Sequence, residues 1–167
     1  MSKTQEDLKA AFAGESQANR KYLAFAKAAE KEGKTNLARL FRAVAEGETI
    51  HALKHFASMG EIKDSASNLK AAIAGETYEV ETMYPGFIAD AEADGEKAAY
   101  IGFYGANEVE KIHQQEFTKA LATVEGGIDI DGQKYFVCQI CGKLELGEAP
   151  ESCSICKAPK TSFVEIV

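Results

Sequence analysis

The sequence contains no hydrophobic run long enough to cross a membrane. A membrane-spanning helix needs about 20 consecutive apolar residues, and polar residues interrupt every apolar stretch of this chain well before that length. The first nine residues, MSKTQEDLK, are strongly charged and do not form the apolar segment that a secretory signal requires. We therefore expect a cytoplasmic protein.

The sequence is also poor in positive charge. Its 19 Lys and Arg residues are outnumbered by 26 Asp and Glu residues, and the formal net charge is −7. This balance disfavours binding to nucleic acids or anionic membranes, which attract basic surfaces. Hydrophobic residues form 46% and charged residues 27% of the 167 residues. These proportions are typical of a globular protein with a real core.

Cysteine is missing from most of the chain, because all four cysteines lie between positions 138 and 156. In a reducing compartment such clustering favours a metal site over a disulfide framework. The spacing is C-x2-C-x11-C-x2-C, formed by Cys138, Cys141, Cys153 and Cys156. Two such knuckles predict a tetrahedral site with four sulfur ligands, which suits either zinc or a single iron. A structural zinc that only holds the C-terminal segment together is the simplest alternative.

Four long helical patterns precede the cysteines, with apolar residues recurring every three or four positions. We predict helices over residues 4–32, 35–59 and 96–124. A third helical pattern follows the loop 61–68 and carries Leu69, Ala72, Ile73, Met83 and Phe87, with a kink or break at Tyr84–Pro85, where proline removes a backbone donor. Helices of this length joined by short loops pack most naturally as a four-helix bundle. The Gly126–Gly127 pair ends the helical pattern, and short β-type runs then surround the cysteines. A domain boundary is expected at residues 125–132.

The helical part contains an internal repeat. FAGESQAN at 12–19 resembles IAGETYEV at 73–80, and AEGETIH at 45–51 resembles NEVEKIH at 107–113. The Gly-Glu pairs are 61 residues apart, whereas the Glu-x-x-His units are 62 residues apart. We interpret the first two helices as a duplicate of the third and fourth.

Carboxylates interrupt every apolar stripe of these helices. The interrupting residues are Glu15 on the first helix, Glu48 and His51 on the second, Glu76 and Glu79 on the third, and Glu110 and His113 on the fourth. An ionised carboxylate in an apolar core is very unfavourable unless it takes a proton or binds a cation. Two divalent cations would resolve this problem, with Glu48 and Glu110 bridging both metals.

One glutamate from each of two helices and a Glu-x-x-His unit from each of the other two form the ligand set of dinuclear carboxylate bundles. A lone Glu-x-x-His unit is usually a partly exposed pair, but two units in a duplicated frame predict a dinuclear metal site. We interpret His55 and the off-stripe acids as structural or surface residues; these acids are Glu46, Glu81 and Glu108. Tyr22 and Tyr84 are candidate core residues, or phenols that hydrogen-bond a ligand carboxylate.

Taken together, these segments resemble the rubrerythrins over nearly the whole chain. The resemblance lies in FAGESQANRKY, FRAVAEGETIHALKHF, NLKAAIAGETYEVETMYPGF, EVEKIH and the C-terminal CQICG…EAPESCSICKAPK. It implies a mainly α fold with a ferritin-like di-iron four-helix bundle over residues 1–125 and a small rubredoxin-like β/knuckle domain over residues 133–167. The implied activity is reduction of hydrogen peroxide to water, as a cytoplasmic defence against oxidative stress in anaerobic or microaerophilic microbes.

The resemblance also implies the site residues. The non-haem di-iron ligands would be Glu15, Glu48, His51, Glu76, Glu79, Glu110 and His113, and the four cysteines would hold one iron as Fe(Cys)4. It further implies a redox-linked exchange of His51 for Glu79. Charge counting supports this exchange, because four carboxylates already balance two Fe(II) ions, whereas two Fe(III) ions favour a fifth. Protons would pass through carboxylates such as Glu79 or Glu48, or through Tyr22 and Tyr84.

The chain has no G-x-G-x-x-G segment for binding NAD(P)H. Electrons are therefore expected from a partner such as rubredoxin or a rubredoxin-reductase-type donor, and the resemblance implies a homodimer or a larger assembly. Ser154 and Lys157 stand where rubredoxins typically have proline and glycine, and Lys143 stands where an aromatic residue is common. A lysine in a left-handed turn costs on the order of 1 kcal/mol.

Two alternative functions remain open at the level of sequence. A ferritin-like ferroxidase or iron-storage protein uses the same bundle, but it needs neither the cysteine module nor Glu79. A metal-stabilised scaffold with structural zinc would not be an enzyme at all.

Overall fold

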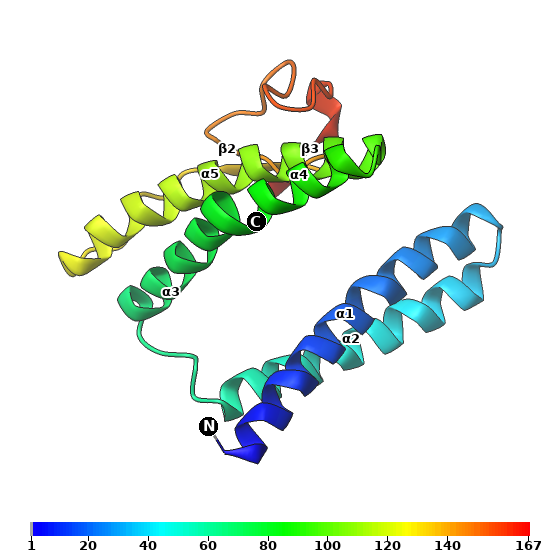
Figure 1. Ribbon diagram of the computed structural model, residues 1–167, viewed down its shortest axis with the longest axis horizontal. Coiled ribbons are helices and arrows are strands. Elements are labelled where there is room, and N and C mark those ends of the chain that lie inside the picture. The colour runs from blue at the N-terminus through cyan, green and yellow to red at the C-terminus, as the bar shows by residue number, and fades with distance from the viewer. Residues whose placement is uncertain (1) are drawn as a thin grey trace. The chain divides into compact units, whose positions relative to one another are not determined.

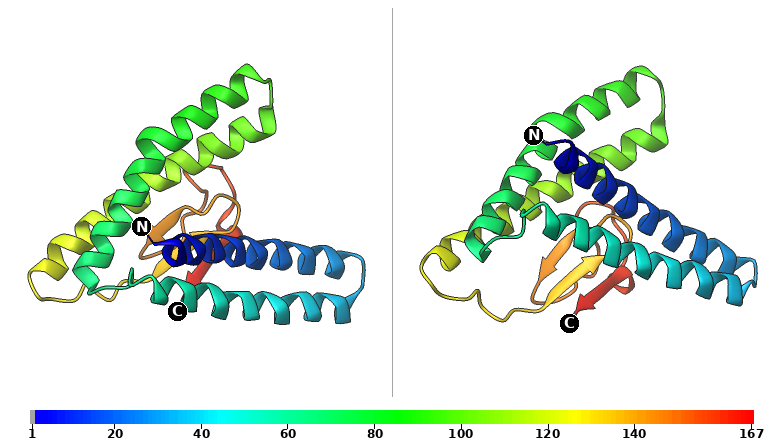
Figure 2. Two further views of the ribbon diagram at one scale, coloured as in Figure 1. Left: turned by 60° about the horizontal axis from the view of Figure 1, so that its bottom comes forward. Right: turned by 90° about the horizontal axis from the view of Figure 1, so that it is seen from below.

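The computed structural model describes residues 2–167 (Figures 1 and 2). The helical part consists of α1 (Lys3–Lys31), α2 (Thr35–Ser58), α3 (Ser65–Tyr78), a π-helical segment η1 (Glu79–Met83), α4 (Tyr84–Ala93) and α5 (Lys97–Glu125). The C-terminal part consists of β1 (Tyr135–Cys138), β2 (Leu144–Leu146), a 3-10 turn η2 (Lys160–Ser162) and β3 (Phe163–Ile166). The chain forms two compact units, Met1–Lys63 and Asp64–Val167. Over residues 2–167, no helix combines the length and hydropathy that a membrane crossing requires.

The first unit is a hairpin of α1 and α2. Gly33, with a φ of +74°, forms the turn between them in a left-handed conformation that suits glycine. The buried apolar side chains of the two helices are all small: Ala26, Ala29, Ala38, Ala45 and Ala52. Small residues let the two helix backbones approach closely, so the alanine face of α2 packs against α1.

The sequence marks an apolar stripe of Leu37, Leu40, Phe41 and Val44 on α2, but only part of it packs against α1. Phe41 packs against Ala26 and Ala29 of α1, whereas Leu37, Leu40 and Val44 remain 39%, 59% and 41% exposed. The predicted start of this helix at Thr35 is confirmed, and the helix ends at Ser58, one residue before the predicted end. Lys34 occupies the N-cap position and makes no side-chain capping bond.

The second unit begins with another helical hairpin, in which α3, η1 and α4 follow one another and run beside α5 (Figure 1). Asp64 caps α3, since its carboxylate accepts a hydrogen bond from the backbone N–H of Ser67. The irregularity predicted at Tyr84–Pro85 is a π turn that immediately precedes these two residues. The helix passes through a π turn at Glu79–Met83 and resumes as α4 at Tyr84, with Pro85 in the first turn.

The C-terminal module of this unit is a small antiparallel sheet with strand order β2-β1-β3 (Figure 2). The sequence predicts β1 and β3, and the structure adds β2, whose three residues carry too little pattern to be recognised alone. Cys138 and Phe163, which face each other in the β1–β3 register, form the core of the module together with Cys153. The sheet also packs on its own helix, because β2 contacts α5. A mainly α protein with a small C-terminal sheet is confirmed.

Candidate metal centres

The two helical hairpins repeat each other in their local structure. The Ser16 hydroxyl donates to the carbonyl oxygen of Phe12 at 2.6 Å, and Thr77, 61 residues later, donates to Ile73 at 2.7 Å. Each hairpin also contains three clustered rings. Tyr22, Phe25 and Phe41 form one triad, and Tyr84, Phe87 and Phe103, each 62 residues later, form the other. The duplication inferred from the sequence is therefore reflected in packing and hydrogen bonding.

The repeat changes its offset at the π turn. Glu15 and Glu76 are 61 residues apart, whereas Tyr22 and Tyr84 are 62 residues apart. The second hairpin thus contains one extra residue between these positions, and η1 occupies this interval. A π turn accommodates one additional residue without ending the helix, and such turns are frequent at functional sites. The extra residue falls in the segment that begins with Glu79.

The first cluster of metal-ligand atoms lies on the α1–α2 hairpin. Glu15, Glu48 and His51 each contribute one ligand atom, and these three atoms lie within 4.8 Å of one another. Glu48 and His51 are one turn apart on α2, so their side chains share a face. The Nδ1 atom of His51 lies 3.0 Å from Oε2 of Glu48.

The second cluster has the same composition on α3 and α5. Ligand atoms of Glu76, Glu110 and His113 lie within 4.8 Å of one another, and Nδ1 of His113 lies 2.7 Å from Oε2 of Glu110. Oε2 of Glu76 is buried without a hydrogen-bond partner. Burial, and next the nearby Glu110 carboxylate, raise the pKa of Glu76 to about 7. A buried acceptor without a donor is what a bound cation would satisfy.

The charges of the second cluster affect the pKa values of Glu79 and Tyr84. Burial raises the pKa of Glu79, and the charge of Glu110 raises it further. The pKa of Tyr84 is raised by burial and then by Glu110, Glu79 and Glu76. Both side chains are half-buried. The structure therefore places these two predicted residues close to the cluster, while Tyr22 lies in the aromatic triad of the first hairpin.

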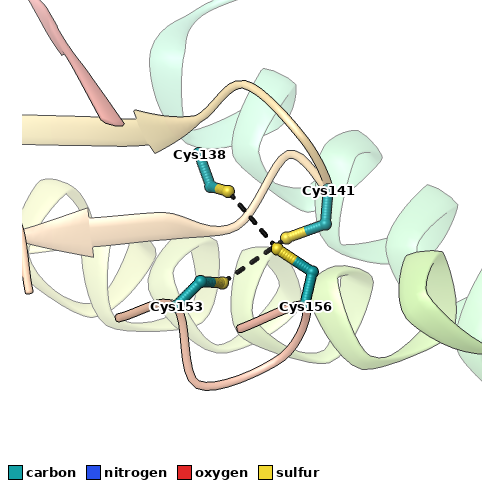
Figure 3. A group of neighbouring side chains, drawn as sticks. All are labelled: Cys138, Cys141, Cys153 and Cys156. Atoms are coloured by element: carbon teal, nitrogen blue, oxygen red, sulfur yellow. Dashed lines mark hydrogen bonds between the residues drawn. The ribbon is translucent and has the colours of Figure 1, made fainter. Parts of the chain in front are cut away.

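The four cysteines converge from two loops (Figure 3). The Sγ atoms of Cys138 and Cys156 lie 3.6 Å apart, as do those of Cys141 and Cys153, and all four ligand atoms lie within 4.8 Å of one another. Burial opposes ionisation of Cys153, but hydrogen bonds from the backbone N–H groups of Cys156 and Ile155 outweigh it and lower its pKa to about 7. Such N–H groups stabilise a thiolate, the form that binds metal.

Lys157 and Lys143 of this module each have a polar partner. Lys157 has a φ of 63°, the left-handed conformation expected from its place in the second knuckle, and its Nζ donates to the carbonyl oxygen of Ser154 at 2.8 Å. The Lys143 side chain is only 11% exposed and forms an ion pair with Glu145.

Sequence reasoning missed two polar pairs that connect the helices beside the clusters. The Nδ2 atom of Asn19 donates to the carbonyl oxygen of Ala45 at 2.7 Å and to Oγ1 of Thr49 at 2.8 Å. In the second hairpin, Nε2 of Gln114 donates to Oγ1 of Thr77 at 2.7 Å. Asn19 is buried on α1, one turn after Glu15. Its position on the same helix face as Glu15 is the sequence feature from which a buried polar contact could have been predicted.

The donor sets fit iron in both places. Carboxylate and imidazole ligands suit non-haem iron, and four thiolates suit a mononuclear iron or zinc. The unsatisfied Oε2 of Glu76 and the four unpaired cysteines support metal occupancy over a purely structural role for these residues.

Comparison with known proteins gives concordant matches. Residues 6–121 match the family described as rubrerythrin, and residues 136–164 match the rubrerythrin rubredoxin-like domain. Nigerythrin from Nitratidesulfovibrio vulgaris is 37% identical over 174 residues, which cover 96% of this chain and 85% of the relative. Rubrerythrin-2 from Clostridium acetobutylicum is 36% identical, with coverage of 96% and 95%. The solved structure of fully reduced, all-ferrous nigerythrin is 36% identical and covers 99% of this chain and 88% of that one, with a TM-score of 0.58.

Proposed function

Because the chain belongs to the rubrerythrin family, we propose that it is a peroxidase that reduces hydrogen peroxide to water. Its cofactors are a non-haem di-iron centre and one iron bound by four cysteines. The family also indicates an oxidoreductase role in oxidative stress, together with redox partners and oligomerisation. The observation that carries the peroxidase proposal is the π turn with Glu79 beside a glutamate–histidine cluster, in a chain that also contains a cysteine iron module.

We assign the ligands as follows. The di-iron centre would be held by Glu15, Glu48, His51, Glu76, Glu79, Glu110 and His113, and the single iron by Cys138, Cys141, Cys153 and Cys156. Support comes from the two clusters of three ligand atoms and the cluster of four sulfurs. Glu79 lies outside these clusters and is included because the charge of Glu110 acts on it. We also propose a di-iron domain over residues 1–125 and an electron-transfer domain over residues 133–167. The end of α5 at Glu125 and the start of β1 at Tyr135 support these bounds.

The reaction consumes one peroxide, two electrons and two protons and yields two waters. The glutamate and histidine clusters would hold the iron that supplies these two electrons, and the four cysteines would hold the iron that replaces them. The protein must deliver the protons into a partly buried site. Glu79 and Tyr84 are suited to this task because they are a half-buried carboxyl and a half-buried phenol, and the charge of Glu110 acts on both. Tyr22 and Glu48 are the corresponding candidates in the first hairpin.

Glu79 has a second proposed role, as the redox-dependent alternative to His51. The first hairpin has Ala18 where the repeat would place a counterpart of Glu79. The fifth carboxylate is therefore available on one side only, which permits an exchange at a single iron. Crystals of the oxidised and reduced protein test this role, and identical coordination by His51 and Glu79 in both would refute it.

Anaerobic stopped-flow spectroscopy of the diferrous protein tests the proposed activity. Oxidation should be faster with hydrogen peroxide than with oxygen, and no iron core should grow. Preference for oxygen with core growth would instead establish a ferroxidase or storage protein. Glu79→Gln should slow peroxide turnover, whereas Glu81→Gln, an exposed acid in the same π segment, is the matched control and should not.

The electron donor and the compartment are also proposals. A rubredoxin or rubredoxin-reductase-type protein would reduce the Fe(Cys)4 centre. A cytoplasmic location agrees with four cysteines that form no disulfide among residues 2–167. A colourless protein that contains only zinc after expression with iron would contradict the electron-transfer role.

A further inference from the structure

Lys143 is a buried cation inside the cysteine module. Its side chain is only 11% exposed and forms an ion pair with the carboxylate of Glu145, which is 30% exposed. Lys134 and Glu165 form another ion pair in the same sheet, but their side chains are 64% and 36% exposed. Removing an ammonium group from water is costly, and the attraction within a buried ion pair often does no more than offset that cost. Stability alone therefore does not account for a buried pair at this position.

The pairing of β1 with β2 places this ion pair on the inner face of the sheet. Phe136 lies opposite Glu145, and two residues further along β1 the backbone N–H of Cys138 donates to the carbonyl oxygen of Lys143 at 2.9 Å. Side chains that lie opposite each other in an antiparallel pair share a face. Phe136 and Cys138 belong to the core of the module. Lys143 and Glu145 therefore lie on the face of the sheet that carries the metal-binding Cys138.

Two of the four ligand cysteines are direct neighbours of Lys143. The Cβ atoms of opposite residues in an antiparallel pair are about 4.5–5.5 Å apart, so the side chain of Lys143 begins beside that of Cys138. The backbone N–H of Lys143 donates a hydrogen bond to the sulfur of Cys141. The ammonium group of Lys143 is thus within one lysine side chain of the sulfur cluster. A charge held at this range and away from water is screened much less than a charge on the surface.

The reduction potential of an iron bound by cysteines depends on net charge, on hydrogen bonds to the sulfurs and on exposure to solvent. Reduction from Fe(III) to Fe(II) adds one negative charge to the site and forms or breaks no bond. A fixed positive charge nearby stabilises the reduced form more than the oxidised form. We infer that Lys143 raises the reduction potential of the iron held by the four cysteines, and that Glu145 fixes the lysine in place and offsets part of its charge.

This inference rests on the proposed electron-transfer role of the cysteine module and assigns a residue that sets its driving force. Lys143 contacts neither peroxide nor the glutamate and histidine clusters in this scheme, and it acts only through the iron of the module. A higher potential favours the transfer of each electron from the reduced partner protein to this iron. It also lowers the driving force for the next transfer, to the di-iron centre. Lys143 therefore sets the balance between accepting and passing on an electron.

A redox titration of the iron-loaded, full-length protein tests the inference. The midpoint potential is measured anaerobically from the visible absorbance of the ferric Fe(Cys)4 centre. Lys143→Met keeps a long apolar side chain and removes the charge, so the potential should fall. Glu145→Gln removes the opposing negative charge, so the potential should rise. Lys134→Met removes a lysine of the exposed ion pair in the same sheet, and as the matched control it should leave the potential unchanged.

The double variant Lys143→Met/Glu145→Gln should have a potential between those of the two single variants, because the two charges act in opposite directions. The shift in Lys143→Met should also persist at high salt, since a buried charge is screened little. A potential in Lys143→Met equal to that in Lys134→Met would overturn the inference, because the ion pair would then only fill the interior. Glu145→Gln is an independent test if Lys143→Met fails to bind iron, and a potential that does not rise in it would overturn the inference as well.

The midpoint potential is measured without peroxide, so the two proposals can fail separately. Shifted potentials in a protein that does not turn over peroxide would refute the proposed peroxidase function and leave the role of Lys143 intact. Peroxide turnover at the wild-type rate, with unshifted potentials in both single variants, would support the proposed function and refute the role of Lys143.

Discussion

The π turn offers a sharp test of how the second hairpin is built. Deletion of Glu81 removes one residue from the segment Glu79–Met83 and restores the seven-residue interval found between Glu15 and Tyr22. We expect the shortened segment to become regular α-helix, with Tyr84 in place and Glu79 shifted. The first hairpin supports this expectation, because it forms the same aromatic triad without an extra residue.

The change in the free energy of unfolding on deletion of Glu81 distinguishes two outcomes. If the helix absorbs the deletion, α4 keeps its position and the free energy of unfolding should change by about 0.5 kcal/mol or less, as for ordinary surface changes. If it does not, α4 rotates by about 100° and moves by ~1.5 Å. The contacts of Tyr84 and Phe87 with Phe103, whose ring centroids lie 6.3 and 5.4 Å away, would then be lost. Two such ring pairs account for about 1–3 kcal/mol beyond the burial of their area.

Urea unfolding followed by circular dichroism measures the stability of the deletion variant, and stopped-flow mixing with peroxide measures its activity. The expected result is near-normal stability with reduced peroxide turnover. The substitution Glu81→Gln, which keeps the residue count, is the control and should change neither. A deletion variant that loses more than about 3 kcal/mol would show that the extra residue is not absorbed locally. Unchanged turnover would show that the π turn does not position Glu79.

Three further changes test individual parts of the molecule. Cys153→Ser should abolish turnover with a physiological electron donor but preserve a single turnover of the pre-reduced di-iron centre, as measured by stopped flow; loss of both would contradict separate roles for the two centres. Lys157→Gly should stabilise the cysteine module by about 0.5–1 kcal/mol, because relief of the left-handed strain, ~1–2 kcal/mol, exceeds the entropy cost of glycine. Guanidinium unfolding followed through the Fe(Cys)4 absorbance measures this gain, and a loss of stability would refute it. Asn19→Ala should cost about 1–2 kcal/mol, since it removes two hydrogen bonds of a buried side chain; urea unfolding that matches the wild type would show that these bonds contribute nothing.

Much of the candidate site could be predicted from the sequence because its information is local. Glu48 and His51 share a helix face through their three-residue spacing alone, and the same is true of Glu110 and His113. The spacing of the four cysteines likewise specifies two knuckles that can meet at one metal. The internal repeat strengthened the prediction of a metal site. One Glu-x-x-His unit can arise by chance, but a second copy in the same frame is much less likely to do so.

Only the tertiary structure shows which face of a helix packs against its neighbour, and which backbone conformation a segment adopts. Alanines rather than the leucine stripe of α2 pack against α1, because close approach of two backbones selects small side chains. The change of offset from 61 to 62 residues is visible in the sequence, but only the folded helix shows it as a π turn at Glu79–Met83. A periodic pattern in the sequence specifies which residues share a helix face. Packing between segments that are distant in the chain determines which neighbour covers that face. The same packing determines how the backbone accommodates an extra residue.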